Sequence, residues 1–190
     1  MCSSDLGITW LEADIAAWRP AAPVDLLYSN AALHWLADHP RLLPRLLGHL
    51  APGGVLAVQM PQTGHGRWRE ILLETAATGP WAEELRPFAG QGNVLAPRDY
   101  HRLLQGGTSG LDIWESTYLH RLEGADPVAE WTKGAALRPL LAALPPDEAK
   151  AFYDAYRRAL RPAYPPEPDG ATLLPFRRLF IVRSEEHTSE

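Results

Sequence analysis

The stretch Val24-Asp25-Leu26-Leu27-Tyr28-Ser29 decides the fold class of this chain. Its nearly continuous apolar run is typical of a strand buried inside a parallel sheet, where both faces are covered. A second run of this kind spans residues 55–60, and the leucines of residues 39–50 recur at helical spacing between the two. Strand, helix and strand in this order predict an α/β protein. We expect Pro44 in or near the first turn of this helix and Pro52-Gly53-Gly54 to end it.

Weaker signals continue this pattern along the chain. A β-branched and aromatic run predicts a short strand at residues 8–11, followed by Asp14 at its carboxyl end. Asp126 before Pro127 is typical of a helix N-terminus. Further helices are expected at residues 66–78, 97–104, 127–144 and 146–160, and further strands at residues 110–122 and 176–183.

The two ends of the chain fit neither a helix nor a strand pattern. Residues 1–6 are MCSSDL and residues 184–190 are SEEHTSE. Both resemble translated sequencing adapters, so we exclude them from fold reasoning as one excludes tags. We expect one partial domain over residues 7–183, flanked by non-native ends.

Composition limits the classes of function. The 190 residues include 18 Lys and Arg against 23 Asp and Glu, which gives a formal net charge of −5 at pH 7. This acidic balance argues against a general nucleic-acid binder. No apolar run approaches the ~20 residues of a membrane-spanning helix, and the single cysteine excludes an internal disulfide and a multi-cysteine zinc site. We therefore expect a cytoplasmic protein with neither a nucleic-acid nor a membrane partner.

Positive charge is concentrated in one part of the chain. Residues 131–183 contain nine Lys and Arg against five Asp and Glu, a net charge of +4, so the remaining residues carry −9. A cationic region on an acidic protein favours a small anionic ligand. The alternative is that these cations are the ordinary charges of helix surfaces.

Polar residues occur where the apolar runs end. They lie in Glu12-Ala13-Asp14-Ile15, in Ser29-Asn30-Ala31 and in Gln59-Met60-Pro61. In open α/β sheets, ligands bind beyond the carboxyl ends of the strands. These three segments are therefore the first candidates for a binding site.

Several motifs resemble a known family. The proximal motifs resemble Rossmann-like methyltransferases that use S-adenosylmethionine, and they are ADI at 13–15, DLLYSNAALHW at 25–35 and LxPGGVLAVQMP at 50–61. The distal motifs narrow the resemblance to the trans-aconitate methyltransferase family, and they are GPW at 79–81, EWxKGxxLRP at 130–139 and AYPPxxDG at 163–170.

This resemblance implies a Rossmann-like class I methyltransferase fold, α/β, with a mostly parallel sheet and an antiparallel last strand. It also implies a Gly-rich loop after the family's first strand and an acidic residue ending its second, and the sequence shows neither. We therefore expect an N-terminally truncated chain that lacks the first strands. Their loss would leave residues 8–11 loosely placed or wrongly paired and would uncover an apolar edge at residues 24–28.

The cofactor implied by the resemblance is S-adenosylmethionine. Asp14 would accept a hydrogen bond from the adenine amino group, and the segment Ser29-Asn30-Ala31 would face the methionine amine. The implied cofactor-binding residues are Asp14, Ile15, Ser29, Asn30, Ala31 and Trp35. Alternatives stay open, because Asp14 and Asn30 are also common turn residues and Trp35 is also a typical core residue.

The substrate implied by the resemblance is a small polycarboxylic acid that is methylated on a carboxylate. The attacking oxygen is already ionised, so neither a catalytic acid or base nor a metal is expected. Arginine is the preferred clamp for carboxylates. The substrate-binding candidates are His34, Trp131, Lys133, Arg138, Arg177 and Arg178. Arg177 and Arg178 are strand neighbours that point to opposite faces, so at most one is expected at the site.

Other functions remain as alternatives. The acceptor could be another small acid or a malonyl thioester on a carrier protein, or this chain could be a non-catalytic relic. We expect little or no activity from the 190-residue chain and a monomer at full length.

Overall fold

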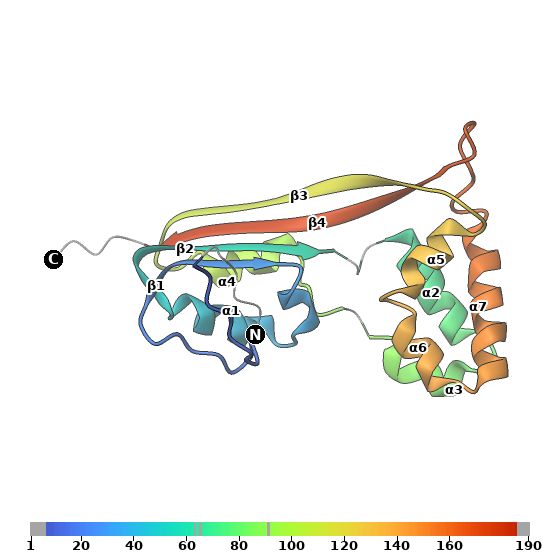
Figure 1. The fold of residues 1–190 in the computed structure, drawn as a ribbon, viewed down its shortest axis with the longest axis horizontal. Helices are drawn as coiled ribbons and strands as arrows, with labels where there is room; N and C mark the ends of the chain where they lie inside the picture. Colours follow the sequence, from blue (N-terminus) through green and yellow to red (C-terminus); the bar gives the residue numbers. More distant parts are fainter. Residues whose placement is uncertain (1–6, 63, 65, 91, 186–190) are drawn as a thin grey trace.

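The computed structural model describes residues 7–62, 64, 66–90 and 92–185. The expectation that residues 1–6 and 186–190 are non-native falls outside this part of the chain. The described residues form one mixed sheet with helices beneath it and beside it (Figure 1). Its four strands are β1 (Val24–Asn30), β2 (Leu50–Pro61), β3 (Thr108–Leu122) and β4 (Thr172–Glu185).

The strand order in the sheet is β1-β2-β4-β3. β1 runs parallel to β2, and β4 is antiparallel to both of its neighbours. The α/β class and the antiparallel last strand are thus confirmed. The helices are η1 (Leu33–Trp35), α1 (His39–Leu47), α2 (Arg67–Ala77), α3 (Ala82–Leu85), η3 (Arg86–Phe88), α4 (Pro97–Leu104), α5 (Pro127–Lys133), α6 (Arg138–Ala143) and α7 (Pro146–Leu160).

Two hydrophobic clusters hold the molecule together. The first lies between the sheet and helices α1 and α4, where Leu43, Leu56 and Ile181 are fully buried. The second lies within the layer formed by α2, α3, α5, α6 and α7 beside one end of β3 and β4, and it includes Leu72 and Phe152 (Figure 1). The carboxyl ends of β1 and β2 therefore face the helical layer, which places a binding site between the two clusters.

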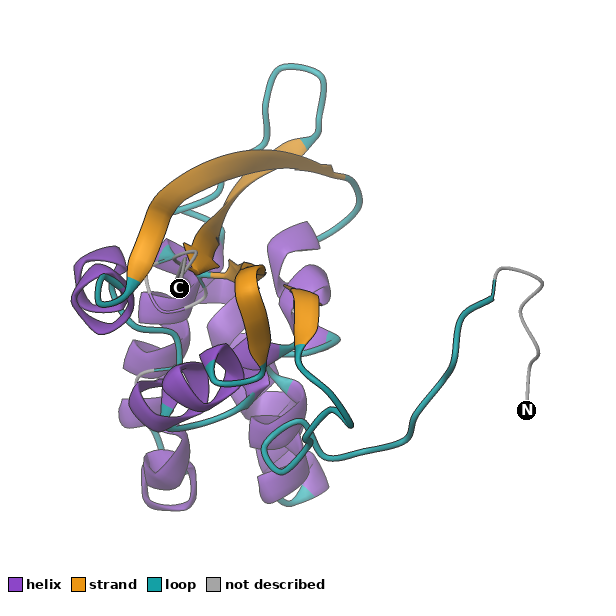
Figure 2. Ribbon diagram, turned by 90° about the vertical axis from the view of Figure 1, so that its left-hand side faces the viewer, coloured by secondary structure: helices purple, strands orange, loops and turns teal. Residues whose placement is uncertain are grey.

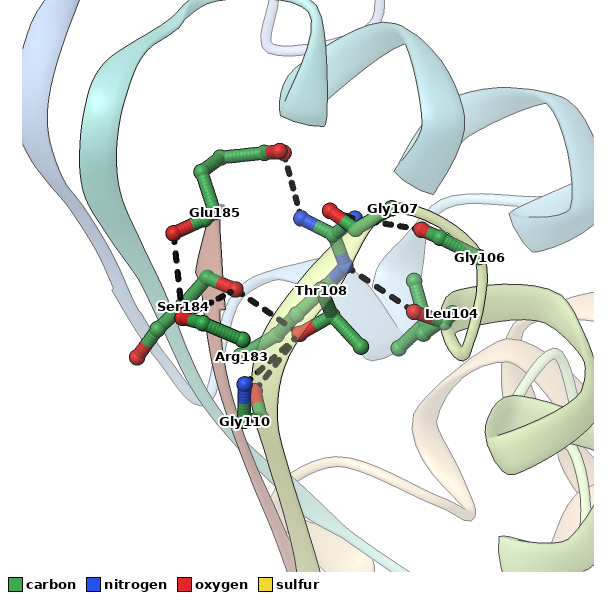
Figure 3. A network of polar contacts seen from close by, with 9 residues as sticks. Leu104, Gly106, Gly107, Thr108, Gly110, Arg183, Ser184 and Glu185 are labelled. Atoms are coloured by element: carbon green, nitrogen blue, oxygen red, sulfur yellow. Dashed lines mark hydrogen bonds and ion pairs between the residues drawn. The ribbon is translucent and has the colours of Figure 1, made fainter. Parts of the chain in front are cut away.

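A buried arginine fixes the other end of the sheet (Figure 3). Arg183 on β4 is 3% exposed and donates from Nε to the Leu104 carbonyl at 2.9 Å. Its Nη2 donates to the carbonyls of Gly106 and Gly107 at 2.7 and 2.9 Å, and its Nη1 pairs with Glu185. The guanidinium thus joins the end of α4 and the turn before β3 to the last strand.

The expected strand at residues 8–11 is wrong. Residues 7–14 have no regular structure, and this part of the chain extends away from the body of the molecule (Figure 2). Ile8, Trp10 and Leu11 are 49%, 72% and 73% exposed. A short apolar run without a neighbouring strand has no partner for its backbone hydrogen bonds. The expectation of a loosely placed segment is therefore confirmed.

The expected uncovered edge is also confirmed. β1 is an edge strand of the sheet, and its Leu26 and Tyr28 side chains are 59% and 68% exposed.

The boundary between α1 and β2 differs from the prediction. α1 ends at Leu47, and Pro52-Gly53-Gly54 lies inside β2 rather than ending the helix. The register with β1 shifts there, and Gly53 adopts a φ of 76°, which glycine tolerates without strain. Pro44 lies in the helix interior, beyond the first turn where we expected it.

The single helix expected over residues 127–144 is two helices, α5 and α6. A continuous helix would need a backbone N–H at residue 139, and Pro139 has none. The predicted helix start is confirmed, since α5 begins at Pro127 with Asp126 at its N-cap. The Asp126 side chain makes no capping hydrogen bond, and its carboxylate accepts from Arg161 at 2.6 and 2.9 Å. The Arg161 guanidinium holds the pKa of the Asp126 carboxyl below its usual range.

The remaining elements lie close to their predicted positions. Helices α2, α4 and α7 match the expected ranges to within a residue or two. β3 begins two residues before the predicted strand, and β4 extends on both sides of its predicted range. Ser184 and Glu185, which we had excluded, pair with β2 and β3.

Candidate functional site

A cavity of about 540 Å³ opens where β1 and β2 end. Its walls come from the segments that follow these strands, from β4, and from the helices α2, α5 and α6. Of the residues predicted from sequence, it brings together Ala31, His34, Trp35, Trp131 and Arg178. A volume of this size suits a small organic ligand.

Arg178 supplies positive charge to the cavity from β4. Its Nη1 donates to Gln59 Oε1 at 3.2 Å, and its guanidinium carbon lies 5.5 and 5.4 Å from the ring centres of Tyr118 and Phe176. Stacking and one hydrogen bond orient the guanidinium, and its other N–H groups have no partner among the described residues and can bind a carboxylate. The Gln59 Nε2 atom is buried and has no hydrogen-bond partner among the described residues.

His34 lines the same cavity, directly after β1. Burial, and to a lesser extent the neighbouring His39, lowers the pKa of the His34 ring. Its Nδ1 is buried without a hydrogen-bond partner in the part of the chain that the structure describes. Buried polar atoms are normally paired, so this nitrogen is available to a ligand. A neutral ring can donate or accept a hydrogen bond but adds no charge.

Aromatic rings form one wall of the cavity. Trp131 on α5 packs edge to face against Phe176 on β4, with ring centres 4.9 Å apart. Trp68 on α2 lies 6.3 Å from Trp131 and is almost fully buried. These rings exclude water from one side of the cavity, which strengthens any charge–charge contact made inside it.

Sequence reasoning missed Arg69, which also lines the cavity. It lies in the first turn of α2, and its Nη2 donates to the Gly90 carbonyl at 3.0 Å. Burial lowers the pKa of its guanidinium. Only its position beside the buried Trp68 hints at this role in the sequence.

A second cavity of about 370 Å³ lies along β1, between this strand, the turn at residues 15–18 and α1. It is lined by Ile15, Ser29 and Asn30, three of the residues that we expected to bind the cofactor. The Ser29 hydroxyl is buried and has no hydrogen-bond partner among the described residues. Among the described residues the cavity therefore offers an unpaired hydroxyl, and the exposed Asn30 is also part of its lining.

Comparison with known proteins gives the family. The chain is 44% identical over 175 residues to the trans-aconitate 2-methyltransferase of Azoarcus sp. strain BH72, covering 92% of this chain and 68% of that protein. It is 45% identical over 173 residues to the enzyme of the same name from Methylobacterium radiotolerans, covering 90% and 66%. The chain belongs to the trans-aconitate 2-methyltransferase family. It spans about two thirds of the length of these relatives, and the resemblance seen in the motifs is confirmed.

The fold agrees with this family. A solved methyltransferase structure from Bacillus halodurans superimposes with a TM-score of 0.51 at 9% identity, covering 92% of this chain and 70% of that one. This likeness supports the Rossmann-like methyltransferase fold and nothing finer. A scan against protein-family models finds no match.

Asp14, one of the cofactor-binding residues that the family resemblance implied, caps a turn in this structure. Its carboxylate accepts from the Ala16 backbone N–H at 2.9 Å, and its carbonyl accepts from Ala17 and Trp18. The neighbouring Ile15 carbonyl accepts from Arg45 at 2.9 Å. The alternative interpretation of Asp14 as a turn residue is therefore the one that the structure shows.

Three of the predicted cations do not line the cavity that contains Arg178. Lys133 pairs with Glu130 at 3.6 Å and lies 4.7 Å from the Tyr153 ring centre. Arg138 is exposed at the start of α6, and Arg177 points to the face opposite Arg178, towards Glu115 at 3.9 Å. The expectation that Arg177 and Arg178 face opposite sides is confirmed.

Within the described residues, no three His, Cys, Asp or Glu side chains gather as metal ligands would. Among the described helices, none has the length and apolar character that crossing a bilayer requires.

Proposed function

We propose that this protein acts in the S-adenosylmethionine-dependent methylation of a carboxylate of a small polycarboxylic acid, trans-aconitate being the first candidate. One observation carries the proposal: the cavity at the ends of β1 and β2 presents the Arg178 guanidinium, and no described residue that lines it is an Asp or Glu. The relatives' name, trans-aconitate 2-methyltransferase, supports the same acid as acceptor.

The residues of this chain would bind and orient the acid. Arg178 would hold one carboxylate, with Gln59 keeping the guanidinium in place. His34 Nδ1 would accept or donate one hydrogen bond, and Trp131 would cover the carbon skeleton. An ionised carboxylate oxygen is already a nucleophile, so alignment and exclusion of water supply the catalysis and no proton transfer is required.

The second cavity is the candidate cofactor site. When bound, S-adenosylmethionine supplies an electrophilic methyl group on a positively charged sulfur. The unpaired Ser29 hydroxyl and the exposed Asn30 fit the polar end of such a ligand, with Ile15 beside them. Ala31 and Trp35 line the acid cavity instead, so they would lie between the donor and the acceptor.

The composition supports a cellular compartment and a class of partner. A net charge of −5 supports a small-molecule partner over nucleic acid, and a single cysteine suits a reducing compartment. We propose a cytoplasmic enzyme that is a monomer at full length.

A binding measurement tests the acid site without requiring turnover. Calorimetric titration of the 190-residue chain with trans-aconitate is expected to give saturable binding, and its uncharged trimethyl ester is expected to give none. Arg178→Gln should weaken binding about tenfold, because a charge-assisted bidentate pair is lost. Arg177→Gln is the matched control on the opposite face. Equal binding of the acid and the ester would overturn the proposal.

Turnover tests the chemistry separately. The chain is mixed with S-adenosylmethionine and each candidate acceptor, and mass spectrometry detects the monomethyl ester. We expect little product from this chain, together with weak binding of S-adenosylhomocysteine, because the sequence shows neither the Gly-rich loop nor the acidic residue that the family resemblance implies for the cofactor. Tight, stoichiometric binding of S-adenosylhomocysteine would contradict the expectation for the cofactor and end the relic alternative.

A further inference from the structure

We propose that Arg69 is a second carboxylate-binding residue of the acid cavity and that it makes the site select acids with two or more carboxylates. This inference rests on the proposed function, in which the same cavity holds a polycarboxylate. Neither the family resemblance nor the sequence pattern pointed to this residue.

The position of Arg69 places its charge in the cavity. Arg69 and Arg178 line the same cavity from different elements, Arg69 from α2 and Arg178 from β4. A ligand with one carboxylate can engage only one of these groups well. A ligand with two separated carboxylates can engage both, each by a planar guanidinium that matches carboxylate geometry.

Most N–H donors of Arg69 have no hydrogen-bond partner among the described residues. A guanidinium has five N–H groups, and the hydrogen bond that the described residues give Arg69 uses one of them, from Nη2 to Gly90. This contact fixes the direction of the side chain. Its neighbour Arg67, in the same turn, instead pairs with Glu70 and Glu74 at 2.9 and 3.3 Å on the exposed surface of the helix.

The charge balance of the cavity calls for an anion. Neither Arg69 nor Arg178 forms an ion pair with an acidic residue in the part of the chain that the structure describes, whereas Arg67, Arg157 and Arg161 all do. A half-buried cation without a counter-charge is partly desolvated, and this cost applies to both guanidinium groups. A dianionic ligand would offset this cost at both guanidinium groups.

A purely structural role for Arg69 is the competing explanation. The bond to the Gly90 carbonyl ties the loop before α4 to α2, and Asn93 of the same loop reaches the His34 carbonyl at 3.4 Å. If Arg69 only held this loop, its loss would weaken binding of every acid by the same factor. If it binds a carboxylate, the loss depends on how many carboxylates the ligand has.

The experiment uses three acids that share an unsaturated chain: trans-aconitate with three carboxylates, trans-glutaconate with two and crotonate with one. Binding to the 190-residue chain is measured by calorimetry for the first two and by NMR titration for crotonate. Arg69→Gln should raise the Kd about tenfold for the first two acids and less than about twofold for crotonate. Arg69→Lys keeps the charge and should recover about half of that loss on a logarithmic scale.

Arg67→Gln is the matched control, since it removes the same charge two residues away on the exposed side of α2. It should leave all three Kd values unchanged. Far-UV circular dichroism checks that each variant is folded, and Arg69→Lys serves as the test if Arg69→Gln is not.

The outcomes separate the two proposals. If the unsubstituted chain binds trans-aconitate and Arg69→Gln changes nothing, or weakens all three acids equally, the inference about Arg69 is overturned and the proposed function stands. If the unsubstituted chain binds none of the acids, the acid site itself is wrong and both proposals fall.

Discussion

His39 and Tyr100 form a buried pair in which the proton positions follow from one carbonyl. The Leu33 carbonyl can only accept, so His39 Nε2, 3.0 Å away, carries the proton. In the neutral ring Nδ1 then accepts from the Tyr100 hydroxyl, which itself accepts from the Leu95 N–H at 3.1 Å. This chain of hydrogen bonds joins η1, α1 and α4 beneath the sheet.

Tyr100→Phe should destabilise the protein. It should also make the free energy of unfolding fall less steeply as pH rises into the alkaline range. The substitution leaves the Leu95 N–H and His39 Nδ1 unpaired, which costs about 1–3 kcal/mol. Burial raises the pKa of Tyr100 from 10.0 to about 12, so the unfolded chain loses this proton first as pH rises. The Tyr100 hydroxyl therefore contributes stability that is fully present below pH 10 and is lost as pH rises towards about 12. Urea unfolding at several pH values between 8 and 12 measures both effects.

An equal loss of stability with pH in Tyr100→Phe and the unsubstituted protein would contradict this account. Other buried tyrosines, Tyr156 among them, also have a raised pKa and keep part of the slope in both proteins. The comparison is therefore between slopes and not between the presence and absence of a slope.

At the level of elements, local sequence signals predicted the positions of most helices and strands. Two helix starts were predicted from prolines, and both are confirmed: α4 begins at Pro97, and α7 begins at Pro146 after Pro145. The failures occurred where tertiary contacts overrode local preference. Pro52-Gly53-Gly54 forms an irregular part of β2 because β1 lies beside it, and the segment at residues 8–11 forms no strand because nothing pairs with it.

The binding site was predictable only in part for a related reason. Ala31, His34 and Trp35 follow a strand directly, so their place at the sheet edge could be read from the sequence. Arg69 lies on a helix whose rotation depends on Trp68 packing among distant residues, and no local pattern reveals that.

Arg183→Met should lower the free energy of unfolding by about 2–4 kcal/mol, because it removes a buried, charged donor from one buried and two more exposed carbonyls. The carbonyls are those of Leu104, Gly106 and Gly107, and Figure 3 shows how all three converge on the guanidinium. Chemical denaturation measures the loss. Arg177→Met, on the same strand but 48% exposed and loosely paired at 3.9 Å, is the control and should change stability little. Similar losses in the two variants would show that the Arg183 network contributes no special stability.

At the scale of the whole molecule, the feature that matters most for self-association is the outer edge of β1, where no described strand pairs with it. It lies at one end of the sheet order, and its exposed Leu26 and Tyr28 share one side of the strand. An exposed apolar edge strand is a template for pairing with another chain. The folded protein is thus expected to associate with copies of itself through β1 rather than through its helical layer.

Substituting both Leu26 and Tyr28 by Lys should suppress this association, because a charged edge repels a second copy. Sedimentation velocity at rising protein concentration should show larger species for the unsubstituted 190-residue chain and a smaller fraction for the double variant. Leu119→Lys is the matched control, since Leu119 is 63% exposed but lies on β3, the edge strand at the other end of the sheet. A monomer at all concentrations, or equal suppression by Leu119→Lys, would show that the β1 edge does not direct association.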